Sequence, residues 1–178
     1  MKKSNIALIG FMGCGKTTIG KNLAILLTYP FIDSDKEIEK QEGKSISAIF
    51  AHAGESYFRK VEKRIIEKIA KGQHQVIATG GGIIKSKDNI CILQSTSILV
   101  YLRGSPEQIY KNIKDDKTRP LLQGKNKQQI INEMLEEREH LYKEAADLVI
   151  SINNRSIKEI VDDIYDQIAS LNRIEFID

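Results

Sequence analysis

A phosphate-binding pattern lies near the start of the chain. Residues 10–17 read Gly-Phe-Met-Gly-Cys-Gly-Lys-Thr and complete the pattern G-x-x-x-x-G-K-[ST]. In a loop of this kind, backbone N–H groups surround the phosphates of a nucleoside triphosphate. We expect Lys16 to reach the β- and γ-phosphate oxygens and the Thr17 hydroxyl to bind Mg²⁺.

The residues on either side of this loop fit a phosphate site. The apolar run 5–9 is typical of a buried strand, and residues 17–27 carry apolar side chains at helical spacing. An anion would also suit the positive end of that helix. The alternative is a glycine-rich turn that only joins a strand to a helix, and the flanking pattern makes the phosphate site the better interpretation.

Two carboxylates follow the next predicted strand. The run 30–32 is a short strand that ends at Asp33 and Asp35. Because this strand should neighbour the first one, Asp33 can reach the metal shell beside Thr17, and Asp35 points the same way if the strand persists. The alternative role for either aspartate is helix capping. We also expect Ser34 and Glu37 to form a capping box for a helix over 35–42.

Two arginines lie on or beside apolar helix stripes. Arg138 falls inside the apolar stripe of the predicted helix 126–143, so its guanidinium faces inward and needs an anionic partner. That partner is either a structural carboxylate or the carboxylate of a substrate held bidentately. Arg59 lies at the edge of the stripe of helix 55–71. It could equally be a surface residue paired with Glu55 or Glu62.

Two further segments are candidates for ligand binding. Gly80, Gly81 and Gly82 follow the predicted strand 75–79, at the end of the sheet where open α/β proteins bind ligands. A plain loop is the alternative. Arg119 lies in the polar segment 114–120 and could supply a cation that arrives on closure, although a solvated loop charge is the simpler interpretation.

The whole pattern predicts an α/β protein. Five predicted strands alternate with helices, which favours a parallel sheet covered by helices on both faces. The strands are expected at 5–9, 30–32, 75–79, 97–102 and 148–151. Helices are also expected around 87–94, from 105 onward and over 156–171. A short helical segment is expected at 45–51 and a tail at 172–178.

Size and composition describe an ordinary globular domain. The chain has 178 residues, and its net charge of +3 is too small to indicate nucleic-acid binding. Cys14 and Cys91 form neither a disulfide framework nor a metal-ligand spacing, so a reducing compartment is expected. No apolar run is long enough to span a membrane, and the start of the chain does not fit a signal peptide. We therefore expect a cytoplasmic, monomeric protein that acts on small molecules.

Taken together, the motifs resemble those of the shikimate kinase family, in order and through nearly the whole chain. They are the phosphate loop, a D-[ST]-D segment, a G-E-x-x-F-R segment, a triple glycine, an R-P-L-L lid segment and an E-R-x-x-L-Y segment. These motifs occupy 10–18, 33–35, 54–59, 79–82, 119–122 and 137–142. Two departures are small, because Cys14 stands where serine or alanine is usual and Thr17 replaces the commoner serine.

The resemblance implies a P-loop fold like that of the nucleoside monophosphate kinases. This is a three-layer fold with a five-stranded parallel sheet, here a single domain over 1–178 with a substrate-binding region at about 33–62 and a lid at about 113–125. It implies transfer of the γ-phosphoryl group of ATP to the 3-hydroxyl of shikimate, with Mg²⁺. This reaction belongs to the route to chorismate and the aromatic amino acids.

The resemblance also assigns roles to single residues. Those expected to hold ATP are Gly13, Cys14, Gly15, Lys16, Thr17, Thr18, Arg119 and Arg155, with Arg155 beside the adenine. Thr17 and Asp33 would hold the magnesium. The residues expected to hold shikimate are Asp35, Arg59, Gly80, Gly81, Gly82 and Arg138. Lys16, Asp33, Asp35 and Arg119 are the expected catalytic residues, and either aspartate could accept the hydroxyl proton.

Three alternatives remain beside this reading. A kinase of the same fold acting on another small acid such as gluconate would use a similar carboxylate clamp. A GTPase-type switch would require N-K-x-D, and residues 126–129 read Asn-Lys-Gln-Gln instead. A binding module without catalysis ought to have lost Lys16, Asp33 or Arg119, and all three are present.

Overall fold

The computed structural model describes residues 3–114 and 126–171. Arg119, most of the expected lid and the expected tail at 172–178 lie outside the described residues. The elements are β1 (Asn5–Ile9), α1 (Lys16–Leu27), β2 (Phe31–Asp33), α2 (Ser34–Glu42), α3 (Ile46–Ile69), β3 (Val76–Ala78), the 3₁₀ helix η1 (Ile83–Lys85), α4 (Lys87–Thr96), β4 (Ser97–Arg103), α5 (Pro106–Ile113), α6 (Lys127–Ala145), β5 (Leu148–Ser151) and α7 (Ile157–Ser170).

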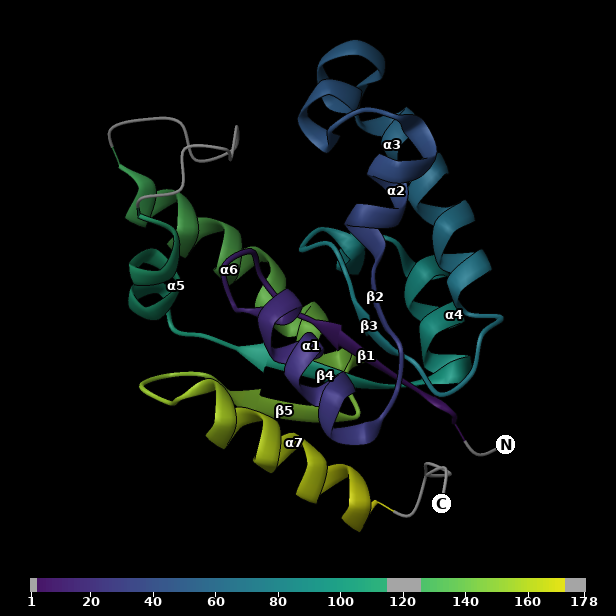
Figure 1. Ribbon diagram of the computed structural model, residues 1–178. Helices are drawn as coiled ribbons and strands as arrows, with labels where there is room; N and C mark the ends of the chain where they lie inside the picture. The colour runs from purple at the N-terminus through teal and green to yellow at the C-terminus, as the bar shows by residue number, and fades with distance from the viewer. Residues whose placement is uncertain (1–2, 115–125, 172–178) are drawn as a thin grey trace.

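The five strands form one parallel sheet, as predicted. Their order is β2-β3-β1-β4-β5, and every neighbouring pair is parallel. The expectation that the strand ending at Asp33 neighbours the first strand is wrong, because β3 pairs with both and lies between β2 and β1. In Figure 1 the sheet lies at the centre of the molecule with helices on both sides. Because all strands run the same way, the loops that follow them converge at one edge, where a ligand site is expected.

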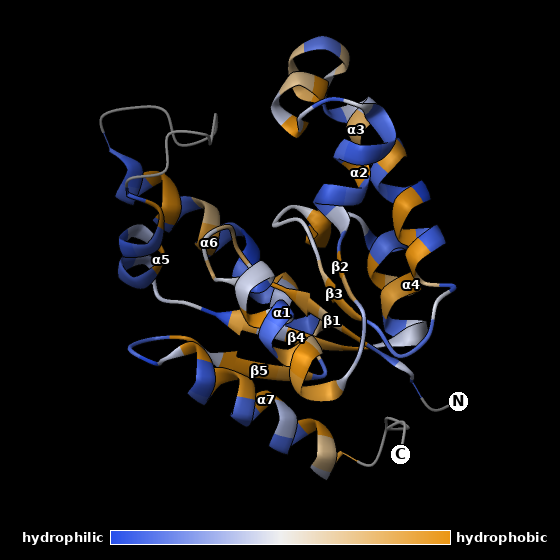
Figure 2. Cartoon of the chain, viewed as in Figure 1, coloured by the Kyte–Doolittle hydropathy of each residue, from blue (hydrophilic) through white to orange (hydrophobic). Residues whose placement is uncertain are grey.

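Side-chain alternation along the strands divides the core into two layers. On β1, Ile6 and Leu8 pack in the core shared with α1 and α7, whereas Ala7 and Ile9 pack against α3, α4 and α6. All four side chains are fully buried. Figure 2 shows the resulting pattern, with hydrophobic strands in the centre and hydrophilic residues on the outer side of α7. In the described part of the chain, no helix is both long and apolar enough to cross a membrane.

Gly54 interrupts α3 at the position that the sequence predicts. Its backbone has φ 76° and ψ 175°, which is not helical, so two helices meet there. Glycine adopts this positive φ without the steric cost that a Cβ would add. The first part of α3 and α2 project at the top of the molecule in Figure 1, while the second part of α3 packs on the sheet. The break lets one long segment cover the core and also border the site.

A third, smaller apolar cluster supports the phosphate loop from the other side. It joins Phe11 of the loop to Ile109 and Ile113 of α5 and to Ile131 and Leu135 of α6. Ser105 caps α5 through the N–H of Gln108, with a proline in the first turn, as the sequence predicts. The loop is therefore packed between the sheet and the two helices that flank residues 115–125.

Candidate functional site

The phosphate loop connects β1 to α1 in the conformation that its glycines permit. Gly13 has φ 78° and Gly15 has φ 85°, both in the left-handed region that favours glycine. Gly15 is the N-cap of α1 and supplies no side chain, so the first N–H groups of the helix have no side-chain cap. Uncapped N–H groups at the positive end of a helix form a site for an anion.

Lys16 points back into this loop. Its Nζ donates hydrogen bonds to the carbonyl oxygens of Gly10 and Phe11, at 2.8 and 2.9 Å, and lies 3.6 Å from Sγ of Cys14. Only 9% of Lys16 is exposed. The ammonium group is thus held at the inner side of the loop, where its charge is poorly screened by water.

Thr17 and Asp33 meet where the sequence predicts a metal site. The Thr17 hydroxyl donates to Oδ2 of Asp33 at 2.8 Å, so β2 brings this carboxylate to the start of α1. A hydroxyl and a carboxylate oxygen are hard ligands of the kind that Mg²⁺ takes, usually together with phosphate oxygens and water. The two residues therefore fit a magnesium ion shared with a bound nucleotide.

Asp33 also caps α2, and the predicted capping box of Ser34 is wrong. Oδ1 of Asp33 accepts from the N–H groups of Asp35 and Lys36, at 3.1 and 3.3 Å. Ser34 lies inside the helix, and its buried hydroxyl has no hydrogen-bond partner among the described residues. The helix begins at Ser34, one residue earlier than predicted, which moves the N-cap back to Asp33. Capping and proximity to Thr17 are combined in one carboxylate, each through a different oxygen.

Asp35 lies deeper, in the first turn of α2. Burial raises the pKa of its carboxyl to about 6, and the charge of Asp33 adds to this, while Lys16 opposes it. Oδ1 of Asp35 lies against Gly80, only 2.6 Å from the place that a Cβ on that glycine would occupy. A carboxyl group with a pKa near neutrality is well suited to accept a proton.

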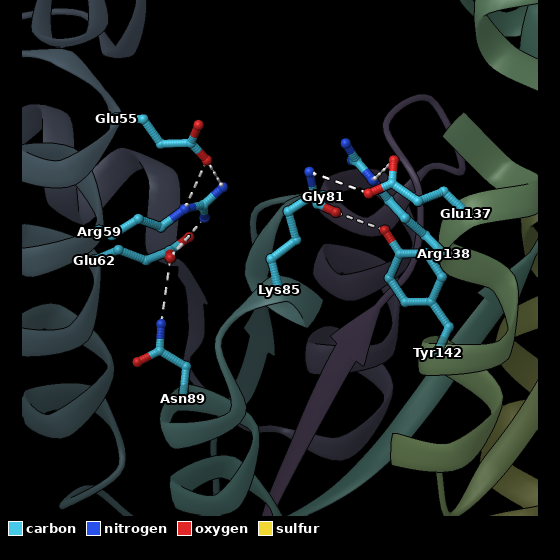
Figure 3. A network of polar contacts seen from close by, with 9 residues as sticks. All are labelled: Glu55, Arg59, Glu62, Gly81, Lys85, Asn89, Glu137, Arg138 and Tyr142. Atoms are coloured by element: carbon cyan, nitrogen blue, oxygen red, sulfur yellow. Dashed lines mark hydrogen bonds and ion pairs between the residues drawn. The ribbon is translucent and has the colours of Figure 1, made fainter. Parts of the chain in front are cut away.

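Arg59 reaches the site from the second part of α3, held by two carboxylates. Its Nη1 donates to Glu62 at 2.8 Å, and its Nε and Nη2 donate to Glu55 at 3.3 and 3.1 Å (Figure 3). Glu62 is only 1% exposed and also accepts from Asn89 at 3.3 Å. Burial raises the pKa of Glu62 although Arg59 opposes it. Both of the pairs expected for a surface arginine form, but around a buried glutamate.

Arg138 faces inward from α6, as its place in the apolar stripe predicts. It is 7% exposed, and its Nε has no hydrogen-bond partner among the described residues. Oε2 of Glu137 lies 4.0 Å from Nε, and Glu137 is itself largely exposed. The guanidinium also lies over the Phe11 ring, 5.9 Å from the centroid. No described carboxylate makes a close, buried pair with Arg138, so this cation fits an external anion.

The triple glycine lies between these groups. Gly80 faces Asp35, Gly81 faces the backbone of the phosphate loop at Met12, and Gly82 faces the guanidinium of Arg59. A Cβ at Gly81 would lie 3.0 Å from the Met12 nitrogen, and one at Gly82 would lie 2.7 Å from Nη2 of Arg59. The missing side chains thus allow the acidic, phosphate-binding and cationic parts of the site to approach one another.

Several residues around the site were not predicted. A hollow of about 210 Å³ lies beside the loops that follow β4 and β5, and is lined by Ser105, Glu107, Gln108, Lys111, Asn153 and Asn154. Asn112 next to it donates to the carbonyl of Gly13 at 2.8 Å, which connects α5 to the phosphate loop. No motif marks these residues. Their one signal is that β4 and β5 are neighbouring parallel strands, so the loops after them must be adjacent.

Arg155, expected beside the adenine, is the next residue in the chain after Asn154, which lines this hollow. Its Nη1 donates to Asp163 at 2.7 Å and to the carbonyl of Ser151 at 3.2 Å, and its Nη2 to the carbonyl of Glu159 at 2.8 Å. These bonds hold Arg155 against α7. Arg119, the remaining predicted cation, lies outside the described residues.

Known proteins share both the sequence and the fold. A family model described as shikimate kinase matches residues 12–169. A shikimate kinase of Caldanaerobacter subterraneus subsp. tengcongensis is 43% identical over 160 residues, which is 90% of this chain and 93% of that protein. A shikimate kinase from Acinetobacter baumannii, solved in complex with shikimate, superposes with a TM-score of 0.91 at 38% identity, covering 97% of this chain and 96% of the other.

A more distant likeness shows the fold alone. A gluconokinase from Sinorhizobium meliloti superposes with a TM-score of 0.64 at 17% identity, over 96% of this chain and 95% of the other. The family model, by contrast, spans most of the chain, and the Caldanaerobacter relative is similar along nearly its whole length. The chain belongs to the shikimate kinase family.

Proposed function

We propose that this chain transfers the γ-phosphoryl group of ATP to the 3-hydroxyl of shikimate. The observation that carries the proposal is the buried guanidinium of Arg138, which lies near a complete phosphate loop and has no close carboxylate partner among the described residues. A phosphate site beside a buried cation that lacks a close carboxylate among the described residues suits an acceptor that carries one carboxylate. Shikimate is such an acid, with hydroxyl groups on the same ring.

ATP would occupy the loop between β1 and α1 and the hollow beside α5. The β-phosphate would accept hydrogen bonds from the backbone N–H groups of residues 13–18. Lys16 would exchange its hydrogen bonds to the carbonyls of Gly10 and Phe11 for hydrogen bonds to phosphate oxygens. The hollow beside the loops after β4 and β5 is the place for the adenine, because its polar lining offers donors and acceptors to a base. Arg155 would border the base from the start of α7.

Thr17 and Asp33 are the residues that would hold Mg²⁺. An ion held there would neutralise part of the negative charge that develops on the phosphates during transfer. The hydroxyl and the carboxylate oxygen already lie 2.8 Å apart, so one ion could be within reach of both. We assign the remaining charge neutralisation to Lys16 and to Arg119 from the lid segment.

Shikimate would lie over the triple glycine, with its carboxylate on Arg138. Arg59 would contribute from the opposite side, and Gly80, Gly81 and Gly82 would allow the sugar-like ring to approach the backbone. Figure 3 shows the two arginines reaching toward this segment from α3 and α6. The hydroxyl edge of the ring would then face Asp35 and the phosphate loop.

The chain contributes mainly position and charge to the reaction. The 3-hydroxyl oxygen attacks the γ-phosphorus, the bond from that phosphorus to the bridging oxygen breaks, and ADP leaves with the bond electrons. We assign the hydroxyl proton to Asp35 rather than Asp33, because burial raises the pKa of Asp35 to about 6, whereas Asp33 is committed to Thr17 and to the cap of α2. Holding both reactants in line supplies much of the rate enhancement.

An ADP-release assay tests the proposed function. The protein is supplied with MgATP and, in separate reactions, with shikimate, gluconate, other small hydroxylated acids or no acceptor. We expect ADP release that depends on shikimate and yields shikimate 3-phosphate. Release with gluconate and not with shikimate would keep the phosphate site but overturn the assignment of the acceptor, and no release with any acceptor would favour a binding module.

Replacing Arg138 by methionine should separate binding from stability. Arg138→Met keeps much of the length of the side chain but removes the guanidinium that would bind the carboxylate of shikimate. Shikimate affinity should therefore fall about 100-fold, while MgATP affinity stays within about two-fold. Since a buried cation without a close partner destabilises a fold, the ligand-free variant should also melt at a higher temperature. Titration calorimetry and thermal unfolding measure the two effects.

Arg103→Met is the matched control for that change. Arg103 is half-exposed at the end of β4 and pairs with Glu139 at the surface of the protein. It should alter neither affinity. Unchanged shikimate affinity in Arg138→Met would refute the assignment of the carboxylate site.

The raised pKa of Asp35 predicts a pH-dependent cost to stability. The folded protein keeps this proton up to about pH 6, whereas the unfolded chain releases it near 3.8. The cost is therefore absent below about pH 4, grows between pH 4 and 6 and is constant above, at about 1–3 kcal/mol. In EDTA and without ligands, Asp35→Asn should raise the Tm by several degrees at pH 8 and by little at pH 4.

Glu37→Gln is the control for Asp35→Asn, because it removes one carboxylate from the same helix turn. The control should show whether any gain in Tm comes from the charge of the turn rather than from burial. A gain in Asp35→Asn that is equally large at pH 4 and pH 8 would contradict the buried-carboxyl account.

A further inference from the structure

The middle carbonyl of the triple glycine is held differently from its neighbours. The carbonyl of Gly80 accepts from the N–H of Ile83 at 3.2 Å, and that of Gly82 accepts from the N–H of Lys85 at 3.1 Å. Both bonds are local turn bonds. The carbonyl of Gly81 instead accepts a hydrogen bond from the Tyr142 hydroxyl, at 2.5 Å and across 61 positions of the chain (Figure 3).

Tyr142 is a rigid donor for this bond. Its ring is fully buried on α6 and stacks on the ring of Tyr101 of β4, with centroids 4.9 Å apart and an interplanar angle of 15°. Burial raises the pKa of the Tyr142 hydroxyl although the charge of Arg138 opposes this, so the hydroxyl keeps its proton. A short bond from a side chain with so little freedom fixes its acceptor well.

The same bond joins two parts of the acceptor site. Tyr142 lies four residues after Arg138, so the two side chains share one face of α6. Gly81 lies against the backbone of the phosphate loop at Met12. The Tyr142 hydroxyl therefore connects α6, the helix that carries Arg138, to the triple glycine, which faces Asp35 and Arg59.

We propose that Tyr142 is a positioning residue for shikimate, through its bond to Gly81. The peptide group is planar, so the bond that fixes the Gly81 carbonyl also fixes the N–H of Gly82, the glycine on which a Cβ would meet the guanidinium of Arg59. It also sets the distance from Arg138 to the triple glycine. The inference rests on the proposed function and adds to it a residue that need not touch the substrate.

The test is Tyr142→Phe, which removes one oxygen and keeps the stacked ring. We expect the KM for shikimate to rise about ten-fold, as for the loss of one buried hydrogen bond, with kcat and the KM for MgATP within about two-fold. Tyr101→Phe removes a hydroxyl from the same stack but not the bond to Gly81, and should leave all three values within about two-fold. The rise in Tm that shikimate causes, measured against each variant's own ligand-free Tm, should fall only in Tyr142→Phe.

Three results would overturn this assignment. A shikimate KM within two-fold of the unmodified protein, even with a lower Tm, would make Tyr142 a structural residue. An equal rise in the KM for MgATP would indicate general loosening of the site. An unmodified protein that does not phosphorylate shikimate rejects the proposed function and this assignment with it, whereas an active protein with an unaffected Tyr142→Phe rejects this assignment alone.

Discussion

The guanidinium of Arg138 is buried without a close carboxylate among the described residues, and the acceptor side of the site is arranged around it. Its Nε has no hydrogen-bond partner in the described part of the chain, the carboxylate of Glu137 lies 4.0 Å away, and the ring of Phe11 offers only a weak cation–π contact. An uncompensated buried charge costs several kcal/mol of stability. A bound carboxylate would offset that cost, so the energy lost in folding strengthens the binding of an acidic acceptor. Stability and affinity are thereby opposed at one side chain.

The two arginines of the site, Arg59 and Arg138, differ in how far neighbouring carboxylates neutralise their charge. Arg59 is held by Glu55 and by the buried Glu62, which leaves little net charge on that side. No described carboxylate forms such a pair with Arg138, so the positive charge of the site is concentrated at α6. A monocarboxylic acid would therefore bind with one fixed orientation, its carboxylate at Arg138 and its hydroxyl groups toward Asp35 and the phosphate loop. The three glycines make this possible, because any side chain there would separate these groups.

Much of this arrangement could be predicted from local patterns. The phosphate loop, the five parallel strands, the break at Gly54 and the inward direction of Arg138 all follow from spacing and side-chain type along a short stretch of chain. The cap of α2 could not, because Asp33 and Ser34 are both good caps and the end of β2 decides between them. Glu62 resembles a surface residue of a charged helix, and its burial depends on packing against Asn89 of α4. The hollow beside α5 is assembled from loops about 45 residues apart, which no local pattern connects.

Calorimetry with shikimate and with its methyl ester tests the central claim most directly. The ester keeps the ring and all hydroxyl groups but lacks the negative charge, so it cannot compensate a buried guanidinium. With nucleotide-free protein, we expect shikimate to bind and the ester to bind about 100-fold more weakly or not at all. Equal affinity for the two compounds would mean that Arg138 does not meet the carboxylate, and would contradict the account of the site given above.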